Sequence, residues 1–141
     1  MSGAVFDASV TTRWFIEDDP LFQDCLNARE AHDGVAPMLV IAETANALWR
    51  YVRAGRLNVD AACDAVAIVR DEVALIDDAD LVRAAQVLSQ GLDHPVYDCL
   101  YAALAMRSGL PLVSADLKFV LKFQSVTGLT LKPIPAAGPS P

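Results

Sequence analysis

The chain has 141 residues, of which 54% are apolar, and its formal net charge is −7. This length suits one domain with a substantial hydrophobic core and leaves no room for a second domain. The sequence also contains no apolar run of about 18 residues, which a membrane-spanning helix would need. The negative charge argues against a protein that coats nucleic acid, because lysine and arginine hold phosphate backbones, but it does not exclude a nuclease whose basic residues are gathered locally.

Strand and helix patterns alternate along the chain. Strands are expected at residues 4–6, 34–36, 71–76 and 111–114. Helices are expected at residues 9–15, 20–31, 37–54, 57–70, 77–91 and 95–109, with a short helix and a weak strand within 117–131. This alternation predicts an α/β fold with a mainly parallel sheet covered by helices on both faces.

Proline is concentrated at the end of the chain, at Pro133, Pro135, Pro139 and Pro141. We therefore predict a folded domain over residues 1–132 and a flexible tail over 133–141. The start of the chain leads directly into a strand, without the basic and then hydrophobic leader of an exported protein. Cys25, Cys63 and Cys99 lack the paired spacing of a zinc site and are expected to be reduced, which indicates the cytoplasm.

Acidic residues stand where predicted strands end and within otherwise largely apolar helices. They are Asp7, Glu43, Asp98 and Asp116. Ligands of such sheets bind beyond the carboxyl ends of the strands, so Asp7 and Asp116 would meet if their strands are neighbours. Two carboxylates about 5 Å apart at an effective dielectric of about 20 repel by roughly 3 kcal/mol, so a cluster must protonate, disperse or bind a cation. Oxygen ligands favour Mg²⁺ or Mn²⁺ over zinc.

Each acidic residue also has a simpler explanation. Asp7 suits a turn that bonds its own backbone, with Ser9 as the N-cap of the first helix, and Asp116 suits the N-cap of the last helix. Asp98 suits the first turn of a helix because of the helix dipole. However, its spacing to Ala102 and Ala105 places it at the head of a stripe of small residues that we expect to be buried against the sheet.

Glu43 is the only charged residue within 36–49. The predicted apolar stripe of its helix consists of Ile41, Ala45, Leu48 and Val52. Glu43 lies opposite that stripe on one face with Asn46, a candidate hydrogen-bonding partner, and Arg50, although an exposed glutamate on an amphipathic helix would look the same. Arg50, Arg53 and Arg56 recur at intervals of three, which fits a local basic patch or a solvated helix end. His94, before the helix at Pro95, is expected to be a loop residue without a catalytic role.

Four sequence blocks in order resemble the PIN-domain ribonucleases and, within them, the VapC-like toxins of bacterial toxin–antitoxin pairs. The first covers residues 5–9 with Trp14, and the second covers 36–37, Glu43 and 46–48. The third is Tyr97-Asp98 with Tyr101, and the fourth covers residues 112–116. The resemblance extends over most of the chain.

The resemblance implies a three-layer α/β/α fold with a five-stranded sheet in the order 3-2-1-4-5, and an Mg²⁺- or Mn²⁺-dependent endoribonuclease. It would make Asp7 and Asp98 the main metal ligands, with Glu43 and Asp116 completing the acidic pocket. Ser114 would orient a ligand or the scissile phosphate, which a metal-activated water would attack. It further implies a homodimer, an RNA substrate and an antitoxin partner that covers the site.

Other protein classes share part of this pattern. A haloacid-dehalogenase-like phosphatase needs a second aspartate two residues after the first, where this chain has Ser9. A phospho-accepting receiver domain needs an acidic pair at the first strand, and Ala8 beside Asp7 does not supply one. A catalytically silent PIN-type binding module is the third alternative.

Overall fold

The computed structural model of the chain describes residues 1–136. Its strands are β1 (Ser2–Phe6), β2 (His32–Pro37), β3 (Ala74–Ile76), β4 (Leu112–Ser114) and β5 (Leu131–Pro133). Its helices are α1 (Ala8–Arg13), α2 (Phe22–Ala31), α3 (Leu39–Arg53), α4 (Val59–Glu72), the 3₁₀ helix η1 (Asp78–Asp80), α5 (Val82–Leu92), α6 (Val96–Ser108) and α7 (Leu117–Phe123). The predicted alternation of strands and helices is confirmed.

The strands described here form one parallel sheet in the order β3-β2-β1-β4-β5. In central β1, Val5 pairs with Val35 on one side and with Leu112 on the other. The predicted order is confirmed, and the strands that precede Asp7 and Asp116 are neighbours. A receiver-like sheet has the order 2-1-3-4-5, so this topology excludes that alternative. The direction of the strand order reverses between β1 and β4, which is where such sheets bind ligands.

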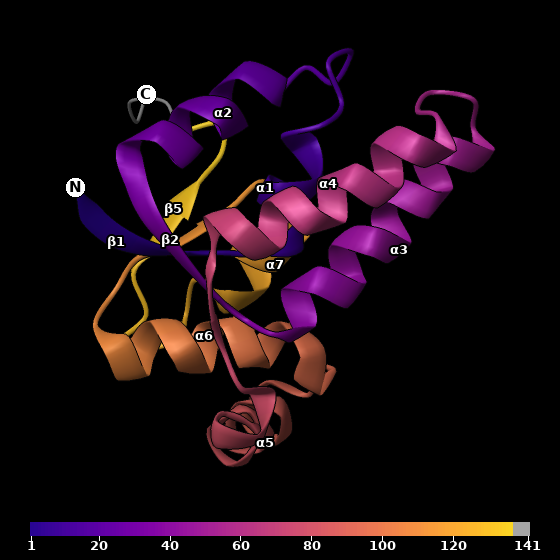
Figure 1. Cartoon of the computed structure of the whole chain (residues 1–141). Coiled ribbons are helices and arrows are strands. Elements are labelled where there is room, and N and C mark those ends of the chain that lie inside the picture. The colour runs from indigo at the N-terminus through magenta and orange to yellow at the C-terminus, as the bar shows by residue number, and fades with distance from the viewer. Residues whose placement is uncertain (137–141) are drawn as a thin grey trace.

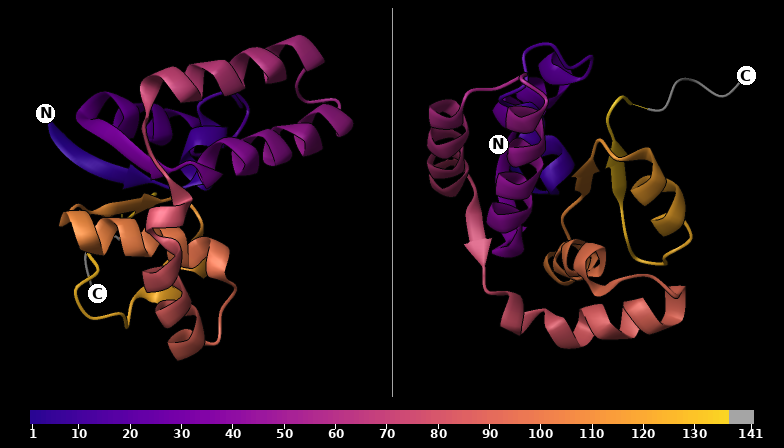
Figure 2. Two further views of the ribbon diagram at one scale, coloured as in Figure 1. Left: turned by 60° about the horizontal axis from the view of Figure 1, so that its bottom comes forward. Right: turned by 90° about the vertical axis from the view of Figure 1, so that its right-hand side faces the viewer.

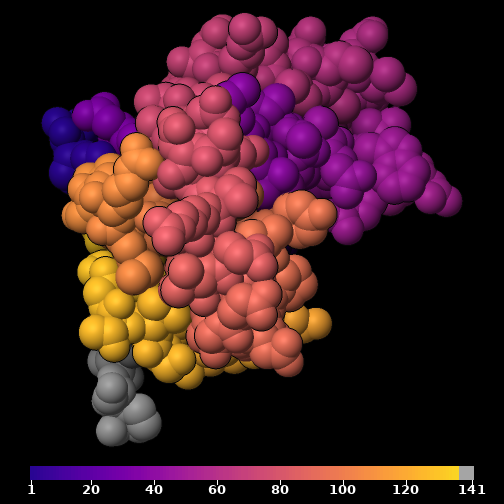
Figure 3. Space-filling model, turned by 90° about the horizontal axis from the view of Figure 1, so that it is seen from below, coloured from indigo at the N-terminus to yellow at the C-terminus, as the bar shows by residue number. Residues whose placement is uncertain are grey.

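Helices cover both faces of the sheet. The helices α1 to α4 lie on one face and the helices α5 to α7 on the other, with α6 against β1, β2 and β4. Figure 1 shows α2 and α4 above the sheet and α6 with α5 below it. The outermost helix of the lower face is α5, which packs on α6 and fills the centre of Figure 3. The hairpin of α3 and α4 projects past the sheet, as the left view of Figure 2 shows.

The core explains why α6 is apolar on all sides. Every residue from 99 to 105 is buried, because α6 lies between the sheet and α5. At the end of β1, Phe6 packs edge-on against Trp14 with the ring centroids 5.7 Å apart. On its other side, Phe6 approaches Gly34 so closely that a Cβ there would lie 2.7 Å from the ring. The residue before Asp7 is therefore tightly fixed.

Two predictions about the helices were wrong in detail. Asp7, and not Ser9, caps α1, because the Asp7 side chain accepts a hydrogen bond from the Ser9 backbone N–H. The helix expected at 77–91 is divided into η1 and α5, since Asp77 caps only the short 3₁₀ helix. Both differences concern the residue that caps a helix. At each of these helix starts, several neighbouring polar residues are suitable caps, so the sequence alone does not identify which one is used.

The apolar stripe predicted for α3 was also shifted. The buried residues of α3 are Val40, Thr44 and Leu48, so of the predicted stripe only Leu48 is fully buried. Thr44 is tolerated in the interior because its hydroxyl lies 2.8 Å from the Thr11 hydroxyl and forms a hydrogen bond between α3 and α1. The side of α3 that carries Glu43 consequently faces α1 and α6.

The folded part of the chain extends past residue 132, the predicted boundary. Pro133 ends β5, and the Ile134 N–H donates a hydrogen bond of 2.7 Å to the Ser114 carbonyl. The remainder of the predicted tail, residues 137–141, lies outside the described residues. Within residues 1–136, no helix combines the length and the apolar character needed to cross a membrane.

Candidate active site

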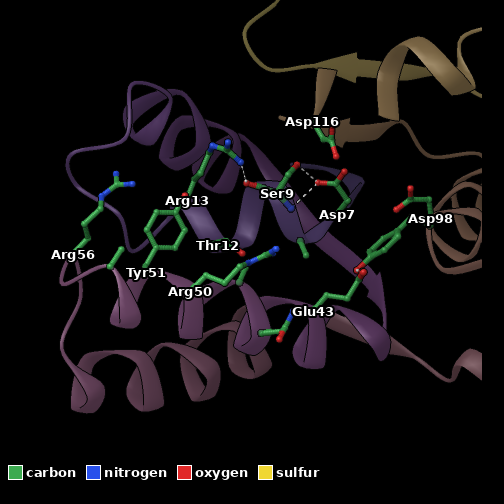
Figure 4. A pocket seen from close by; sticks show the side chains of 15 residues that line it. Asp7, Ser9, Thr12, Arg13, Glu43, Arg50, Tyr51, Arg56, Asp98 and Asp116 are labelled. Atoms are coloured by element: carbon green, nitrogen blue, oxygen red, sulfur yellow. Dashed lines mark hydrogen bonds between the residues drawn. The ribbon is translucent and has the colours of Figure 1, made fainter. Parts of the chain in front are cut away.

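A pocket of about 560 Å³ opens between α1, α3 and α6, where β1 and β4 end. Its volume is within the range of about 300 to 1,000 Å³ that is usual for ligand pockets. The predicted acidic residues all line it, namely Asp7, Glu43, Asp98 and Asp116. Figure 4 shows these carboxylates at one end of the pocket and Arg56 at the other, with Arg13 and Arg50 between them. The fold therefore brings together side chains that are up to 109 positions apart, from Asp7 to Asp116.

Asp7 is the most deeply buried of these carboxylates, with 5% of its surface exposed. Its Oδ1 accepts hydrogen bonds from the backbone N–H of Ser9, at 3.0 Å, and from the Ser9 hydroxyl. Burial raises the pKa of Asp7 to about 6, with a further increase from the charges of Asp116 and Asp98, whereas hydrogen bonds from Ser114 and Ser9 lower it. At neutral pH, Asp7 is ionised in surroundings that disfavour its charge, and a nearby cation would stabilise it.

Two serine hydroxyls fix the orientation of Asp7. The Ser114 hydroxyl donates to Asp7 Oδ2 at 2.5 Å and accepts a hydrogen bond from the Asp116 N–H at 3.1 Å. The Ser9 hydroxyl donates to Asp7 Oδ1 and accepts from the Ala115 N–H at 2.8 Å. Both hydroxyls thus connect the end of β1 to the end of β4. Ser114, the site residue predicted beside Asp116, has its hydroxyl directed at Asp7.

Glu43 is held by a residue that was not predicted as part of the site. The buried Tyr101 donates its hydroxyl to Glu43 Oε1 at 2.6 Å. Burial raises the pKa of Glu43, and the hydrogen bond from Tyr101 lowers it. Asn46, the predicted partner, lines the pocket without a hydrogen bond to Glu43 among the described residues. The signal for Tyr101 was its position three residues after Asp98, which places both on one side of α6.

Asp98 is less buried than its place on α6 predicted. Its side chain is 38% exposed, and its Oδ2 lies 2.7 Å from His94 Nε2. Ala102 and Ala105 are buried as expected, so the stripe is real and Asp98 stands at its exposed end. His94 is fixed by an edge-on contact with the Phe123 ring, with centroids 5.2 Å apart. Its spacing of four from Asp98 was the signal that could have indicated this pair.

Asp116 combines the two roles considered for it. It is exposed and caps α7, accepting a hydrogen bond of 3.2 Å from the Phe119 N–H. The same side chain lines the pocket. Asp7 likewise caps α1 while lining the pocket, so for both residues the capping explanation and the site explanation hold together.

A family model for the PIN domain matches residues 4–122. The chain belongs to the PIN domain family. This assignment agrees with the sheet order described above and leaves no place for the phosphatase alternative. A comparison with curated proteins finds no significant match.

Solved structures with this PIN fold include three that overlap nearly the whole chain. The protein PAE2754 from Pyrobaculum aerophilum is 25% identical, with a TM-score of 0.68 over 92% of this chain and 90% of that one. The Mycobacterium tuberculosis toxin VapC20, described as cleaving the sarcin–ricin loop, is 20% identical, with a TM-score of 0.70 over 84% and 94% of the two chains. A toxin–antitoxin complex from Klebsiella pneumoniae is 16% identical, with a TM-score of 0.66 over 91% and 96%.

The oxygen atoms that line the pocket of this PIN domain are of the type that binds a hard divalent cation, since Mg²⁺ and Mn²⁺ prefer carboxylate and hydroxyl oxygens as ligands. Among the described residues, no three side chains of histidine, cysteine, aspartate or glutamate lie close enough together to hold a metal ion. Coordination would therefore require the carboxylates lining the pocket to draw together. Asp7 is the fixed point of such a site, because its serine partners hold it in place.

Away from the carboxylates, the lining of the pocket is basic. Arg13, Arg50 and Arg56 line the pocket, whereas Arg53 stacks on Trp49 with its guanidinium carbon 5.0 Å from the ring centre. The local basic patch considered for the arginines at intervals of three is thus present in part. Arg13 was not predicted, because it lies in a different helix and only the fold brings it to the pocket.

Proposed function

We propose that this PIN domain is an Mg²⁺- or Mn²⁺-dependent endoribonuclease and the toxin of a toxin–antitoxin pair. The observation that carries the proposal is the convergence of Asp7, Glu43, Asp98 and Asp116, from separate elements, on one pocket at the point where the strand order reverses. A fold alone does not establish an activity, so the proposal depends on these side chains. A buried carboxylate with a raised pKa, in a pocket with further carboxylates, is typical of a functional site.

In this proposal, Asp7 and Asp98 would be the main ligands of the cation, and Glu43 and Asp116 would complete the acidic pocket. When bound, the ion would supply a Lewis acid that activates water for attack on a phosphodiester and offsets the charge that develops. The more exposed side chains of Asp98 and Asp116 would make the movement that draws the carboxylates together. Ser9 and Ser114 hold the two oxygens of Asp7, and Tyr101 holds Glu43, so these two carboxylates are already oriented. Such preorganisation is where a protein contributes most to this chemistry.

The toxin part of the proposal is supported by the relatives that share the fold. One is described as a toxin that cleaves the sarcin–ricin loop, and others as toxin–antitoxin complexes, one of them bound to a promoter DNA fragment. We propose by analogy an RNA substrate, an antitoxin that covers the acidic pocket, a homodimer and a cytoplasmic location. An antitoxin that presents a basic side chain to the pocket would suit its carboxylates.

The test incubates the purified protein, free of antitoxin, with total cellular RNA in the presence of Mg²⁺, Mn²⁺ or EDTA. We expect discrete fragments that require the metal and disappear with Asp7→Ala and with Asp98→Ala. Asp98→Ala should not unfold the domain, because its side chain is partly exposed, and the loss of like-charge repulsion can raise stability.

Asp64→Ala is the matched control, because Asp64 is an exposed aspartate of α4 that does not line the pocket. It should cleave like the wild type. Near-native cleavage by folded Asp98→Ala would refute the assignment of the site. No cleavage by folded wild-type protein loaded with metal would instead favour the catalytically silent binding module.

A further inference from the structure

The arginines that line the pocket differ in what they already bind. Arg13 donates to Asp19 at 3.2 Å and to the Ser9 carbonyl at 2.9 Å. Arg56 binds both carboxylate oxygens of Asp18, at 3.1 and 2.7 Å. Arg50, in contrast, forms no ion pair and no side-chain hydrogen bond within residues 1–136. Its guanidinium is the pocket's available cation among these three.

A second feature points to a ligand at the same place. Thr12 is 97% buried, with 3% of its surface exposed, and it lines the pocket. Within residues 1–136 its hydroxyl is buried and has no hydrogen-bond partner, whereas the hydroxyl of neighbouring Thr11 forms a hydrogen bond with that of Thr44. Buried hydroxyls are nearly always paired, so an orphan that lines a pocket calls for an explanation. In Figure 4, Thr12 and Arg50 both point into the pocket between Arg56 and the carboxylates.

The position of Arg50 relates it to the acidic end. Glu43 and Arg50 are seven residues apart on α3, two helical turns on the same face, which corresponds to about 10 Å along the helix axis. A group bound by Arg50 therefore lies beside the carboxylates without displacing them. Because the whole chain carries a net charge of −7, a polyanion needs a local cation of this kind to remain bound next to them.

We propose that Arg50 and Thr12 form a subsite for one phosphate of an RNA strand, next to the phosphate that is cleaved at the carboxylates. Arg50 supplies the charge and a planar pair of donors, and the Thr12 hydroxyl donates to a second phosphate oxygen. The inference rests on the proposed nuclease function and adds the direction in which the strand leaves the acidic end, along α3 toward α1. A phosphate contact of this kind fixes the position of the strand and does not read its sequence.

The experiment measures binding apart from cleavage. A short fluorescent single-stranded RNA of mixed sequence is titrated with the full chain in EDTA, and the Kd is determined by anisotropy over a series of KCl concentrations. The variants are Arg50→Gln, Arg50→Lys and Thr12→Val. The control Arg53→Gln removes the same charge from the same helix, at a residue that stacks on Trp49 and does not line the pocket. Thermal unfolding of every variant verifies that it is folded.

Arg50→Gln should raise the Kd about tenfold, because it removes a charged hydrogen bond. It should also reduce the slope of log K against log salt by about 0.7, the value for one contact with a single strand. Arg50→Lys should keep the slope and lose part of the affinity. Thr12→Val should weaken binding about threefold to tenfold with an unchanged slope and an unchanged or higher Tm, because it removes a hydrogen bond but no charge.

Equal Kd values and slopes for Arg50→Gln and Arg53→Gln would overturn the subsite, as would a wild type that does not bind the RNA. A Thr12→Val variant with wild-type affinity would remove Thr12 from it. The nuclease function can fail independently of the subsite. If the wild type binds RNA through Arg50 but cleaves no RNA with Mn²⁺, the subsite is supported and the nuclease function is not. If the wild type cleaves RNA but Arg50→Gln and Arg53→Gln bind it with equal Kd values and slopes, the nuclease function is kept and the subsite is lost.

Discussion

The charge of Asp7 opposes folding when no cation is bound. Burial raises its pKa to about 6 from an ordinary value of 3.8, so the folded protein binds a proton more tightly than the unfolded chain does. Protonation of Asp7 therefore stabilises the folded state fully below about pH 4, and this stabilisation is lost as the pH rises from about 4 to about 6. A difference of about 2 pKa units corresponds to a loss of about 3 kcal/mol at neutral pH.

Asp7→Asn should remove this penalty. Asparagine caps a helix as well as aspartate does, so the bond from the Ser9 N–H is retained. In EDTA, we expect the variant to be more stable than the wild type by about 1 to 3 kcal/mol at pH 7.5 and equally stable near pH 4. Urea unfolding at both pH values measures the difference. Exposed Asp64→Asn is the control, and a gain that is equal at both pH values would contradict the explanation.

The acidic residues of the site and Ser114 could be predicted from the sequence, whereas Tyr101 and Thr12 could not. Asp7 and Asp116 follow apolar strands, and this local pattern needs no knowledge of the fold. Tyr101 meets Glu43 across 58 positions, a contact that depends on how α6 packs beside α3. The same is true of Thr12, whose unpaired hydroxyl becomes visible only when its surroundings are known.

At the scale of the elements, the close packing of β1 on β2 determines where Asp7 lies. Gly34 in β2 leaves no room for a Cβ, which would be 2.7 Å from Phe6 Cε2 and 2.8 Å from Cδ2. Phe6 cannot retreat easily, because its ring is fully buried and contacts Trp14 on the other side. Phe6 and Asp7 are adjacent, so a shift of the ring is transmitted to the carboxylate.

Gly34→Ala should therefore destabilise the domain by about 1 to 3 kcal/mol through overpacking. It should also lower the cleavage rate more than the loss of stability explains, measured at a temperature where the variant is fully folded. Gly91→Ala, in α5, is the control, because a Cβ at Gly91 meets nothing within 4 Å. Unchanged stability of Gly34→Ala would show that β2 relaxes around the new methyl group.

The helices and strands could be predicted because the spacing of apolar residues differs between the two, whereas the residues at which they begin and end could not. Asp7 and Ser9 are both good capping residues, and in the structure Asp7 caps α1 while the Ser9 hydroxyl accepts a hydrogen bond from the Ala115 N–H, just after β4. Pro133 was predicted to begin a tail because prolines are concentrated at the end of the chain. Proline cannot donate a hydrogen bond to a sheet, but at Pro133 this is tolerated because β5 is an edge strand that pairs, among the described residues, only with β4.

For the whole molecule, the carboxylates that line the pocket predict how divalent cations change the stability of the protein. Proton and metal compete for Asp7, because the carboxylate must be ionised to act as a ligand. An ion that binds only the folded state stabilises it by mass action. We expect Mn²⁺ to raise the Tm of the wild type at pH 7.5, and to raise it less at pH 5, below the pKa of about 6 of Asp7.

The measurement is thermal unfolding with Mn²⁺ or EDTA at both pH values, at matched ionic strength so that general screening of the net charge of −7 cancels. Asp98→Asn should lose most of the Mn²⁺ effect, because it removes one of the two main proposed ligands. Asp64→Asn should retain it. An effect of equal size in all variants would mean that Mn²⁺ acts on the acidic surface in general, and the pocket would then have no special affinity for the ion.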